Sequence, residues 1–148
     1  MKNFKHVFAI IALALVATSS AWAQNSEEAG VRKALEHYLK GHATGDSMEF
    51  KQAFHPESKL FWMRDGKFHQ RTSANYISGA RGKPADDEAQ RKRRIDFIDI
   101  TGNTAVAKIT LDYPDALLTD YMSLLKVGDE WKIVNKIFHA EQRKQATK

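Results

Sequence analysis

The stretch LLTDYMSLLKVGDEWKIVNKIFHAE, residues 117–141, constrains the fold more than any other part of the chain. Two runs of strand-favouring residues flank Gly128-Asp129, a pair suited to a two-residue hairpin turn. With these turn residues, Val127 faces Glu130 and successive side chains point to opposite faces. We therefore predict a β-hairpin with one face directed to the interior.

One face of this predicted hairpin combines large apolar side chains with polar ones. It comprises Asp120, Met122, Leu124, Lys126, Trp131, Ile133, Asn135 and Ile137. We expect it to meet helices, so that Asp120 and Asn135 point inward. A buried carboxylate without a partner or water is unfavourable by several kcal/mol, which indicates a polar-floored cavity near Asp120. The opposite orientation stays open, because a one-residue change in the turn would exchange the two faces.

The other face is more apolar than a solvated sheet requires. It comprises Thr119, Tyr121, Ser123, Leu125, Val127, Lys132, Val134, Lys136 and Phe138. This face is either an ordinary amphipathic exterior or the interface of a homodimer. In the second case we expect Tyr121, Leu125, Val134 and Phe138 to form the contact.

The first third of the mature chain has helical periodicity. A helical stripe is predicted from Val31, Ala34, Leu35, Tyr38 and Leu39. Asp46 or Ser47 then caps a short second helix that ends at His55-Pro56, because a residue before proline resists helical geometry. A third short helix is predicted to start at Ser73.

Strands separate and follow these helices. Residues 59–64 and 67–72 flank Asp65-Gly66, which suits a tight hairpin. In residues 93–100 the apolar alternation shifts between Phe97 and Ile98, which predicts a β-bulge that bends the sheet. Residues 104–114 form a further strand, and residues 81–90 form an exposed, mobile loop. The order predicts an α+β fold with helices on one face of a curved antiparallel sheet.

The N-terminus is typical of a secretory signal peptide. Lys2 and Lys5 precede the apolar run VFAIIALALVA, and small residues at Ala21 and Ala23 predict cleavage before Gln24. We therefore expect export, with the periplasm as the destination, and no stable membrane anchor after cleavage. Residues 24–148 are then a single domain, long enough to bury about two thirds of its unfolded surface.

Composition excludes several classes of site. The chain has no cysteine, so disulfides and thiolate metal sites are absent. No histidine pair has the spacing of a zinc site, and no glycine-rich phosphate loop occurs, so we expect neither a metal nor a cofactor. The formal charge falls from +5 to +3 without Lys2 and Lys5, which does not favour nucleic acid. The basic run RKRR, residues 91–94, is expected to be solvated and partly offset by Asp86, Asp87 and Glu88.

Taken in order, four segments resemble the nuclear-transport-factor-2-like superfamily: YLKGHATGD, AFHPESKLFW, RRIDFIDITGNTAVAKI and TDYMSLLKVGDEWKIVNK. Within it, the chain is similar to the branch described as "putative lumazine-binding", close to the SnoaL-like polyketide cyclases. The resemblance implies a cone (a cystatin-like roll) in which three N-terminal helices are cupped by a bent sheet around a pocket. It also implies frequent homodimers joined through the outer face of the sheet.

Inside such a cone we expect an aromatic-lined pocket for a small apolar or aromatic metabolite. Its predicted lining is Tyr38, Phe54, His55, Trp62, Tyr76, Tyr113, Asp120 and Asn135. The alternative for the aromatic residues is that they are plain core. His42 is a candidate at the pocket mouth, or a brace between its loop and Asp46.

Three functions are compatible with these residues. We expect binding of a small molecule without chemistry. The second hypothesis is a cofactor-independent isomerase, dehydratase or cyclase that uses Asp120 as acid or base, helped by His55. In the alternative interpretation of His55, its ring is hydrogen-bonded at the end of the helix before Pro56. The third functional hypothesis is a pocketless module that dimerises or associates with an envelope protein.

Overall fold

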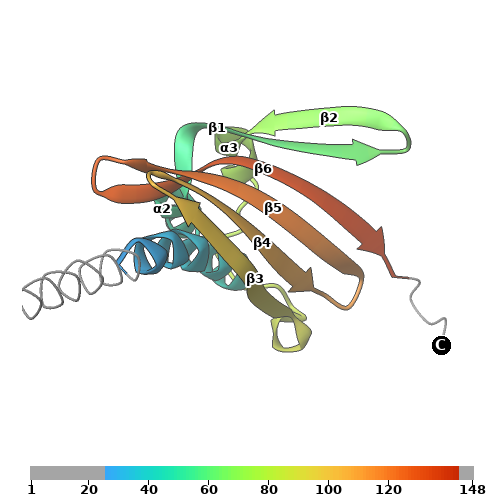
Figure 1. Ribbon diagram of the computed structural model, residues 1–148. Coiled ribbons are helices and arrows are strands. Elements are labelled where there is room, and N and C mark those ends of the chain that lie inside the picture. The colour runs from blue at the N-terminus through green and yellow to red at the C-terminus, as the bar shows by residue number, and fades with distance from the viewer. Residues whose placement is uncertain (1–25, 144–148) are drawn as a thin grey trace, which may run out of the picture.

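The computed structural model describes residues 26–143, and the predicted signal peptide and cleavage site lie outside this range. Three helices pack against one face of a curved six-stranded sheet (Figure 1). The helices cover residues 26–44, α2 (Ser47–Ala53) and α3 (Ser73–Ile77), and a short 3-10 helix, η1, covers Glu88–Gln90. The strands are β1 (Phe54–Arg64), β2 (Lys67–Thr72), β3 (Lys92–Thr101), β4 (Thr104–Asp112), β5 (Ala116–Val127) and β6 (Glu130–Gln142). The predicted α+β class is confirmed.

The sheet has the order β2-β1-β6-β5-β4-β3 and is mixed rather than purely antiparallel. All neighbouring pairs are antiparallel except β1 and β6, which run parallel. The prediction of an antiparallel sheet was wrong at this pair. Alternation within a strand indicates which face is buried, but it carries no information about the direction of a neighbour that is distant in sequence.

Both predicted hairpin turns are present. Arg64 pairs with Lys67 across Asp65-Gly66, and both turn residues have positive φ, 51° and 70°. Val127 pairs with Glu130 across Gly128-Asp129. A two-residue turn with positive φ matches the twist of the flanking strands, which is why an Asp-Gly pair is suited to the turn between β1 and β2.

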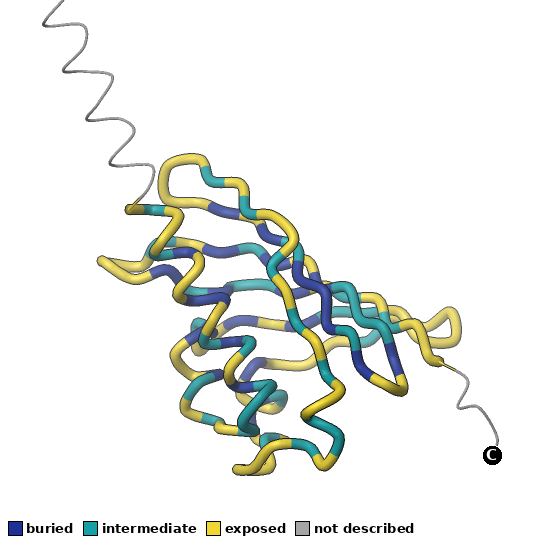
Figure 2. Tube along the Cα trace, turned by 90° about the horizontal axis from the view of Figure 1, so that it is seen from below, coloured by how far each residue is buried: buried dark blue, intermediate teal, exposed yellow. Residues whose placement is uncertain are grey.

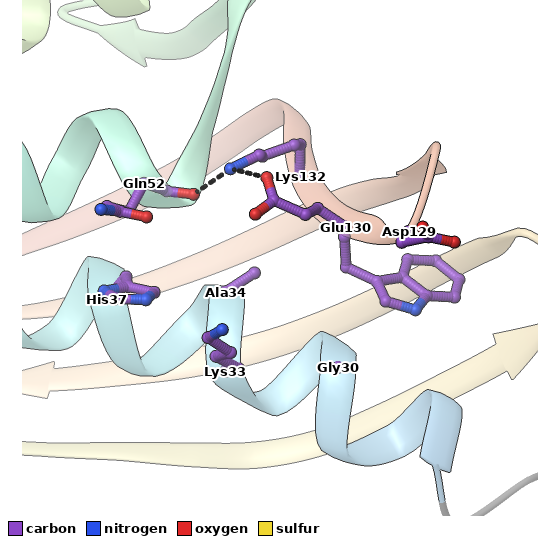
Figure 3. A pocket seen from close by; sticks show the side chains of 9 residues that line it. Gly30, Lys33, Ala34, His37, Gln52, Asp129, Glu130 and Lys132 are labelled. Atoms are coloured by element: carbon purple, nitrogen blue, oxygen red, sulfur yellow. Dashed lines mark hydrogen bonds and ion pairs between the residues drawn. The ribbon is translucent and has the colours of Figure 1, made fainter.

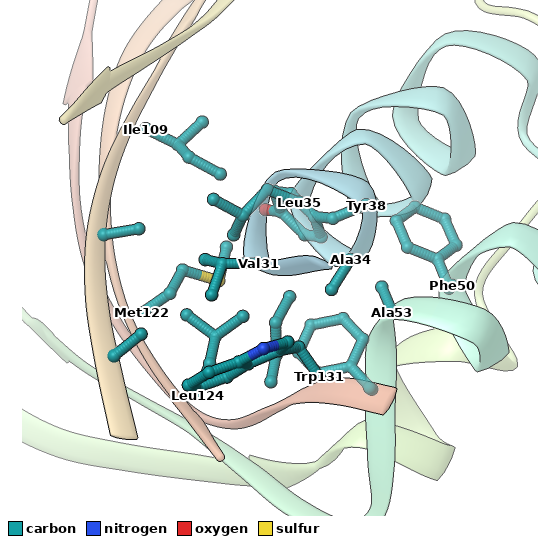
Figure 4. Close-up of a cluster of buried hydrophobic side chains, with 14 of the residues drawn as sticks. Val31, Ala34, Leu35, Tyr38, Phe50, Ala53, Ile109, Met122, Leu124 and Trp131 are labelled. Carbon is teal, nitrogen blue, oxygen red and sulfur yellow. The ribbon is translucent and has the colours of Figure 1, made fainter. Parts of the chain in front are cut away.

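The predicted helical stripe and caps agree with the structure. Asp46 caps α2, and its carboxylate accepts a 2.8 Å hydrogen bond from the backbone N–H of Met48. The cap of α3 is Thr72, one residue before the predicted start at Ser73. From the helix over residues 26–44, buried side chains of Val31, Leu35 and Tyr38 meet the sheet residues Ile109, Met122, Leu124 and Trp131 (Figure 4). Figure 2 shows this burial concentrated where helices and sheet face each other.

The bulge in β3 is confirmed, although it lies slightly earlier than predicted. Ile95 pairs with Ile109 and Phe97 pairs with Lys108, so Asp96 is the extra residue. Asp96 accepts hydrogen bonds from Thr110 and Arg94, and Phe97 is turned outward. The bulge therefore exposes an apolar side chain on the outer face, which we define as the face turned away from the helices.

A second bulge, in β6, was not predicted. Ser123 pairs with Asn135 but Leu124 pairs with Ile133, which leaves Val134 without a partner in the register. Lys136 consequently turns inward and is 3% exposed, whereas Ile137 is 51% exposed. The inward predictions for Asn135 and Ile137, and the outward predictions for Lys136 and Phe138, were wrong for this reason. On the inner face, Phe138 pairs with Asp120.

Within the described residues, no helix is long and apolar enough to cross a membrane.

Candidate functional site

A polar network is buried in the core between the N-terminal helix and the sheet. The Tyr38 hydroxyl donates a 2.6 Å hydrogen bond to Oδ2 of Asp120. Nζ of Lys136 lies 2.9 Å from the same oxygen and 2.6 Å from the Tyr38 hydroxyl. Asp120 and Tyr38 are fully buried. The inward orientation of Asp120 is confirmed, and Lys136 supplies its counter-charge.

Burial dominates the electrostatics of this network. It lowers the pKa of Lys136 from its usual value, against the opposing effect of Asp120. It also raises the pKa of Tyr38 well above its usual value, and the nearby Asp120 carboxylate adds to that effect. Tyr38 is therefore a neutral phenol at physiological pH and acts as a hydrogen-bond donor toward Asp120.

One oxygen of this carboxylate has no partner. Oδ1 of Asp120 is buried and makes no hydrogen bond with any described residue. An unsatisfied buried acceptor is unfavourable, because water would otherwise solvate it. A buried polar atom without a partner requires an explanation in a folded protein. One explanation is that it contacts a ligand or takes up a proton from a substrate.

A second polar layer lies next to this network and is centred on His42. Its Nε2 is 2.8 Å from the Tyr76 hydroxyl, and its Nδ1 is 3.2 Å from the Tyr113 hydroxyl. Arg93 fixes the layer from the other side, donating to the His42 carbonyl at 3.2 Å and to the Tyr113 hydroxyl at 3.1 Å. Its guanidinium also pairs with Glu88 at 2.6 Å.

His42 is neutral in this environment. Burial lowers its pKa well below the usual value, and repulsion from Lys136, Arg93 and Arg91 lowers it further. The ring has edge-to-face contacts with Tyr38 and Phe50, with centroids 4.7 Å and 5.3 Å apart. His42 therefore connects the buried network to the surface as a neutral hydrogen-bonding group.

This second layer is reached from a surface hollow of about 260 Å³, which we call the mouth pocket. Its lining comprises Gly41, His42, Gly45, Phe50, Tyr76, Gly79, Ala80, Arg81, Lys83, Ala85 and Arg91. The pocket-mouth placement expected for His42 is thereby found. Phe50 and Tyr76, whose ring centroids are 5.4 Å apart, provide an aromatic wall.

Several predicted lining residues come together in this region. Phe54 lies 5.8 Å from Tyr38 and 5.9 Å from Tyr76, ring centroid to centroid. Tyr113 joins them through His42, and Asp120 joins them through Tyr38. Their spacing along the chain placed all of them on inward-facing positions.

Trp62 lies further along the inner face. It pairs with Phe138 in the sheet register and stacks on that ring at 5.4 Å, with Arg71 above it at 4.8 Å. Its Nε1 is buried and has no hydrogen-bond partner among the described residues. Trp62 therefore belongs to the same face as Asp120, and Phe138 connects it to the buried network, because Nζ of Lys136 lies 4.8 Å from the centroid of the Phe138 ring.

Two predicted site residues lie elsewhere. His55 follows Phe54, which pairs with Ile133, whereas Asp120 pairs with Phe138. Five residues of β6 separate these positions, roughly 17 Å at strand spacing, so the proposed His55–Asp120 dyad does not form. The His55 ring instead accepts from the backbone N–H of Glu57 at 3.2 Å. Asn135 lies on the outer face, for the register reason given above.

Sequence reasoning missed Lys136 and Arg93. Lys136 was assigned to the outer face because no residue pattern marks the β6 bulge. Arg93 was placed in a solvated basic run, but its side chain is only 8% exposed and is paired with Glu88. The expected compensation by Asp87 and Glu88 is correct, since Asp87 pairs with Arg91 at 2.7 Å.

Other hollows lie outside the polar layers. A hollow of about 70 Å³ lies between the N-terminal helix and the β5–β6 turn, where Lys132 is held by Glu130 and the Gln52 carbonyl (Figure 3). A more apolar groove of about 530 Å³ lies between α2, β1 and α3, and Phe54 and His55 contribute to it. Among the described residues, no group of three or more histidines and carboxylates could hold a metal ion.

Comparison with known proteins identifies the family to which this fold belongs. Residues 26–139 match the family model described as "Putative lumazine-binding". The chain belongs to this family. A nuclear-transport-factor-2-like protein of unknown function from Shewanella baltica OS155 has 28% sequence identity and a TM-score of 0.70, over 78% of this chain and 94% of that one. A second such protein, from Methylobacillus flagellatus KT, has 27% identity and a TM-score of 0.66, over 78% and 92%.

One relative of this chain has the name of an enzyme. It is the aldolase FrzH from a Cladobotryum species, 29% identical over 108 residues, which is 72% of this chain and 85% of that protein. The structural neighbours confirm the nuclear-transport-factor-2-like fold predicted from the sequence.

Proposed function

We propose that the protein binds a small, partly apolar molecule in the mouth pocket. The supporting observation is that this hollow opens onto His42 and Tyr76, which lie next to the buried Tyr38–Asp120–Lys136 network. A concave site with aromatic walls and a few convergent polar groups is the usual form of a small-molecule site. Membership of a family described as lumazine-binding supports a flat ligand.

The binding proposal is tested by ligand-dependent stability. Molecules that copurify with the protein would be identified by mass spectrometry and then added back in thermal unfolding. At a ligand concentration 100 times Kd, stabilisation of about 2.7 kcal/mol is expected. Ala80→Trp, which fills the mouth pocket, should abolish this stabilisation, whereas the exposed Ala89→Trp should retain it. Equal stabilisation of both variants would reject the mouth pocket as the site.

A second candidate is cofactor-independent catalysis at a carbon next to a carbonyl group. It is favoured by the free Oδ1 of the fully buried Asp120 and by the aldolase name of the Cladobotryum relative. In this scheme Oδ1 of Asp120 removes a proton from that carbon. The Tyr38 hydroxyl, which donates to Oδ2 of Asp120 beforehand, then turns to donate its hydrogen bond to the resulting enolate oxygen. The proton then returns to carbon in an isomerisation, or to the alkoxide formed in an aldol addition.

Single-residue variants separate the two candidates. Once a ligand is identified, Asp120→Asn should abolish turnover and Tyr38→Phe should reduce it by about 10²-fold or more, while both variants still bind. The absence of any turnover by the wild type, with intact binding, would leave the non-catalytic function. If no ligand stabilises the protein, the pocketless interaction module is the remaining possibility.

We also propose that residues 1–23 direct export and are removed. The support is the charged start, the apolar run and the small residues before Gln24. N-terminal sequencing of protein from the periplasmic fraction should begin at Gln24. A start at Met1 in that fraction would contradict cleavage.

A homodimer through the outer face completes the proposal. Tyr121, Leu125 and Ile137 are 47%, 40% and 51% exposed on that face. Val134 from the predicted contact remains beside them, whereas Phe138 is replaced by Ile137 because of the β6 bulge. Exposed apolar side chains gathered on one surface are typical of an interaction site.

A further inference from the structure

All charged side chains that line the mouth pocket are cationic. Among the residues that line it, Arg81, Lys83 and Arg91 are cationic and none is a carboxylate. Arg91 is paired with Asp87, but within residues 26–143 neither Arg81 nor Lys83 makes an ion pair. Two cationic groups at the rim are therefore available to a ligand.

The segment that carries Arg81 and Lys83 is fixed in place. The backbone N–H of Gly82 donates a 2.9 Å hydrogen bond to the Gly45 carbonyl. Gly45 has a φ of 70° and packs so closely on Lys83 that a Cβ would lie 2.2 Å from the Lys83 carbonyl oxygen. On the opposite wall, a Cβ at Gly41 would lie 2.8 Å from the Phe50 ring. The pocket wall thus depends on close backbone contacts that only glycine permits.

The residues that line the mouth pocket include no carboxylate that could balance the charges of Arg81 and Lys83. Both ring nitrogens of His42 are engaged by tyrosine hydroxyls, and the nearby Glu88 carboxylate already pairs with Arg93. The depressed pKa of His42, caused by burial and then by Lys136, Arg93 and Arg91, is consistent with a positive potential at this position. A low-dielectric wall concentrates such a potential on the space it encloses.

We infer that the ligand of the mouth pocket is a small aromatic carboxylate. Arg81 and Lys83 hold the carboxylate at the rim, and the ring packs against the aromatic wall formed by Phe50 and Tyr76. A hollow of about 260 Å³ lies at the lower end of the usual range for ligand pockets, which suits one ring with short substituents. This inference rests on the proposed binding function and specifies the class of its ligand.

Benzoate and benzamide are the probes, because they share a ring and differ in charge. Their affinities are measured by NMR titration of the mature protein at low and high salt. We expect benzoate to bind about tenfold more tightly than benzamide at low salt, and the difference to shrink as salt screens the rim charges. The double variant Arg81→Gln/Lys83→Gln should lose this preference.

The matched control removes the same number of charges at a distant site. Arg64 and Lys67 are exposed at the tip of the β1–β2 hairpin, so Arg64→Gln/Lys67→Gln should keep the preference for benzoate. Equal loss in both double variants would show a non-specific charge effect and overturn the inference. Equal binding of the two probes, or binding of neither, would also overturn it. The binding proposal itself has a separate test: it fails if copurified ligands stabilise Ala80→Trp as well as the wild type, or if no ligand stabilises the wild type.

Discussion

Lys136 is buried because its ammonium group is held by the Asp120 carboxylate and the Tyr38 hydroxyl. Two ions removed from water incur a desolvation penalty that their attraction offsets only when both are present. Within the network, Asp120 without Lys136, or Lys136 without Asp120, would therefore destabilise the fold. The arrangement explains how the Asp120 carboxylate can be fully buried in the core.

Lys136→Met should strongly destabilise the protein. The substitution leaves Asp120 as an unpaired buried charge, for which we expect a loss of about 3–5 kcal/mol in the free energy of unfolding, measured in urea. The double variant Asp120→Leu/Lys136→Met should recover most of that loss, since an apolar pair needs no counter-charge. A double variant no more stable than Lys136→Met would show that the pair stabilises the fold by more than charge balance.

His42 makes stability depend on pH. Its folded-state pKa is depressed, so at a pH above the usual histidine value both folded and unfolded states are neutral and the group has no effect. As the pH falls below about 6.5, only the unfolded state takes up the proton, and stability should fall by up to about 1.4 kcal/mol per pH unit.

Urea unfolding at a series of pH values between 7.5 and 5 tests this expectation. His42→Gln should show a shallower loss of stability than the wild type, whereas the exposed His139→Gln should keep the wild-type slope. A wild-type slope in His42→Gln would mean that another group causes the acid sensitivity.

At the scale of elements, the mouth pocket depends on the packing of residues 79–83 against Gly45. Gly45 and Gly82 have nearly equal φ values, 70° and 71°, but a Cβ at Gly82 would meet nothing within 4 Å. The two positions share the same backbone requirement and differ only in the space available to a side chain.

Comparing alanine substitutions at Gly45 and Gly82 therefore isolates the steric cost of a side chain at the pocket wall. Gly82→Ala should cost about 1–2 kcal/mol for the left-handed backbone alone. Gly45→Ala should cost distinctly more, because its Cβ also collides with the Lys83 backbone, and it should weaken benzoate binding. Chemical denaturation and the NMR titration measure the two effects. Equal costs at both positions would show that the 79–83 segment moves away without penalty.

The sequence was sufficient to predict most elements and the inward position of Asp120. Period-two alternation in β5 and helical spacing around Tyr38 depend on local geometry, which side-chain polarity reveals. No residue pattern marks the β6 bulge, and the parallel β1–β6 pairing joins strands that are distant in sequence, so neither left a local signal. Lys136 and the His55–Asp120 dyad were misassigned for those two reasons. Which cations remain unpaired at the pocket rim also required the three-dimensional structure.

For the whole molecule, the proposed homodimer interface on the outer face leads to a test of the oligomeric state. If the proposed homodimer forms there, Tyr121→Glu should produce a monomer, because two buried carboxylates would face each other without partners. Met48→Glu is the control, since Met48 is 56% exposed on α2, on the side of the sheet opposite to the proposed interface. Sedimentation equilibrium measures the mass of each variant. A wild type that sediments as a monomer would end the dimer proposal.

The position of β6 in the sheet has a consequence for how the chain folds. The last strand to be synthesised lies between β1 and β5, so the β1–β2 hairpin has no neighbour in the sheet until β6 is complete. Parallel pairing of such distant segments is slow, because loop-closure entropy must be overcome first. A chain in which β6 has not yet paired therefore holds two separate sheet fragments, and the cone closes only when β6 joins them.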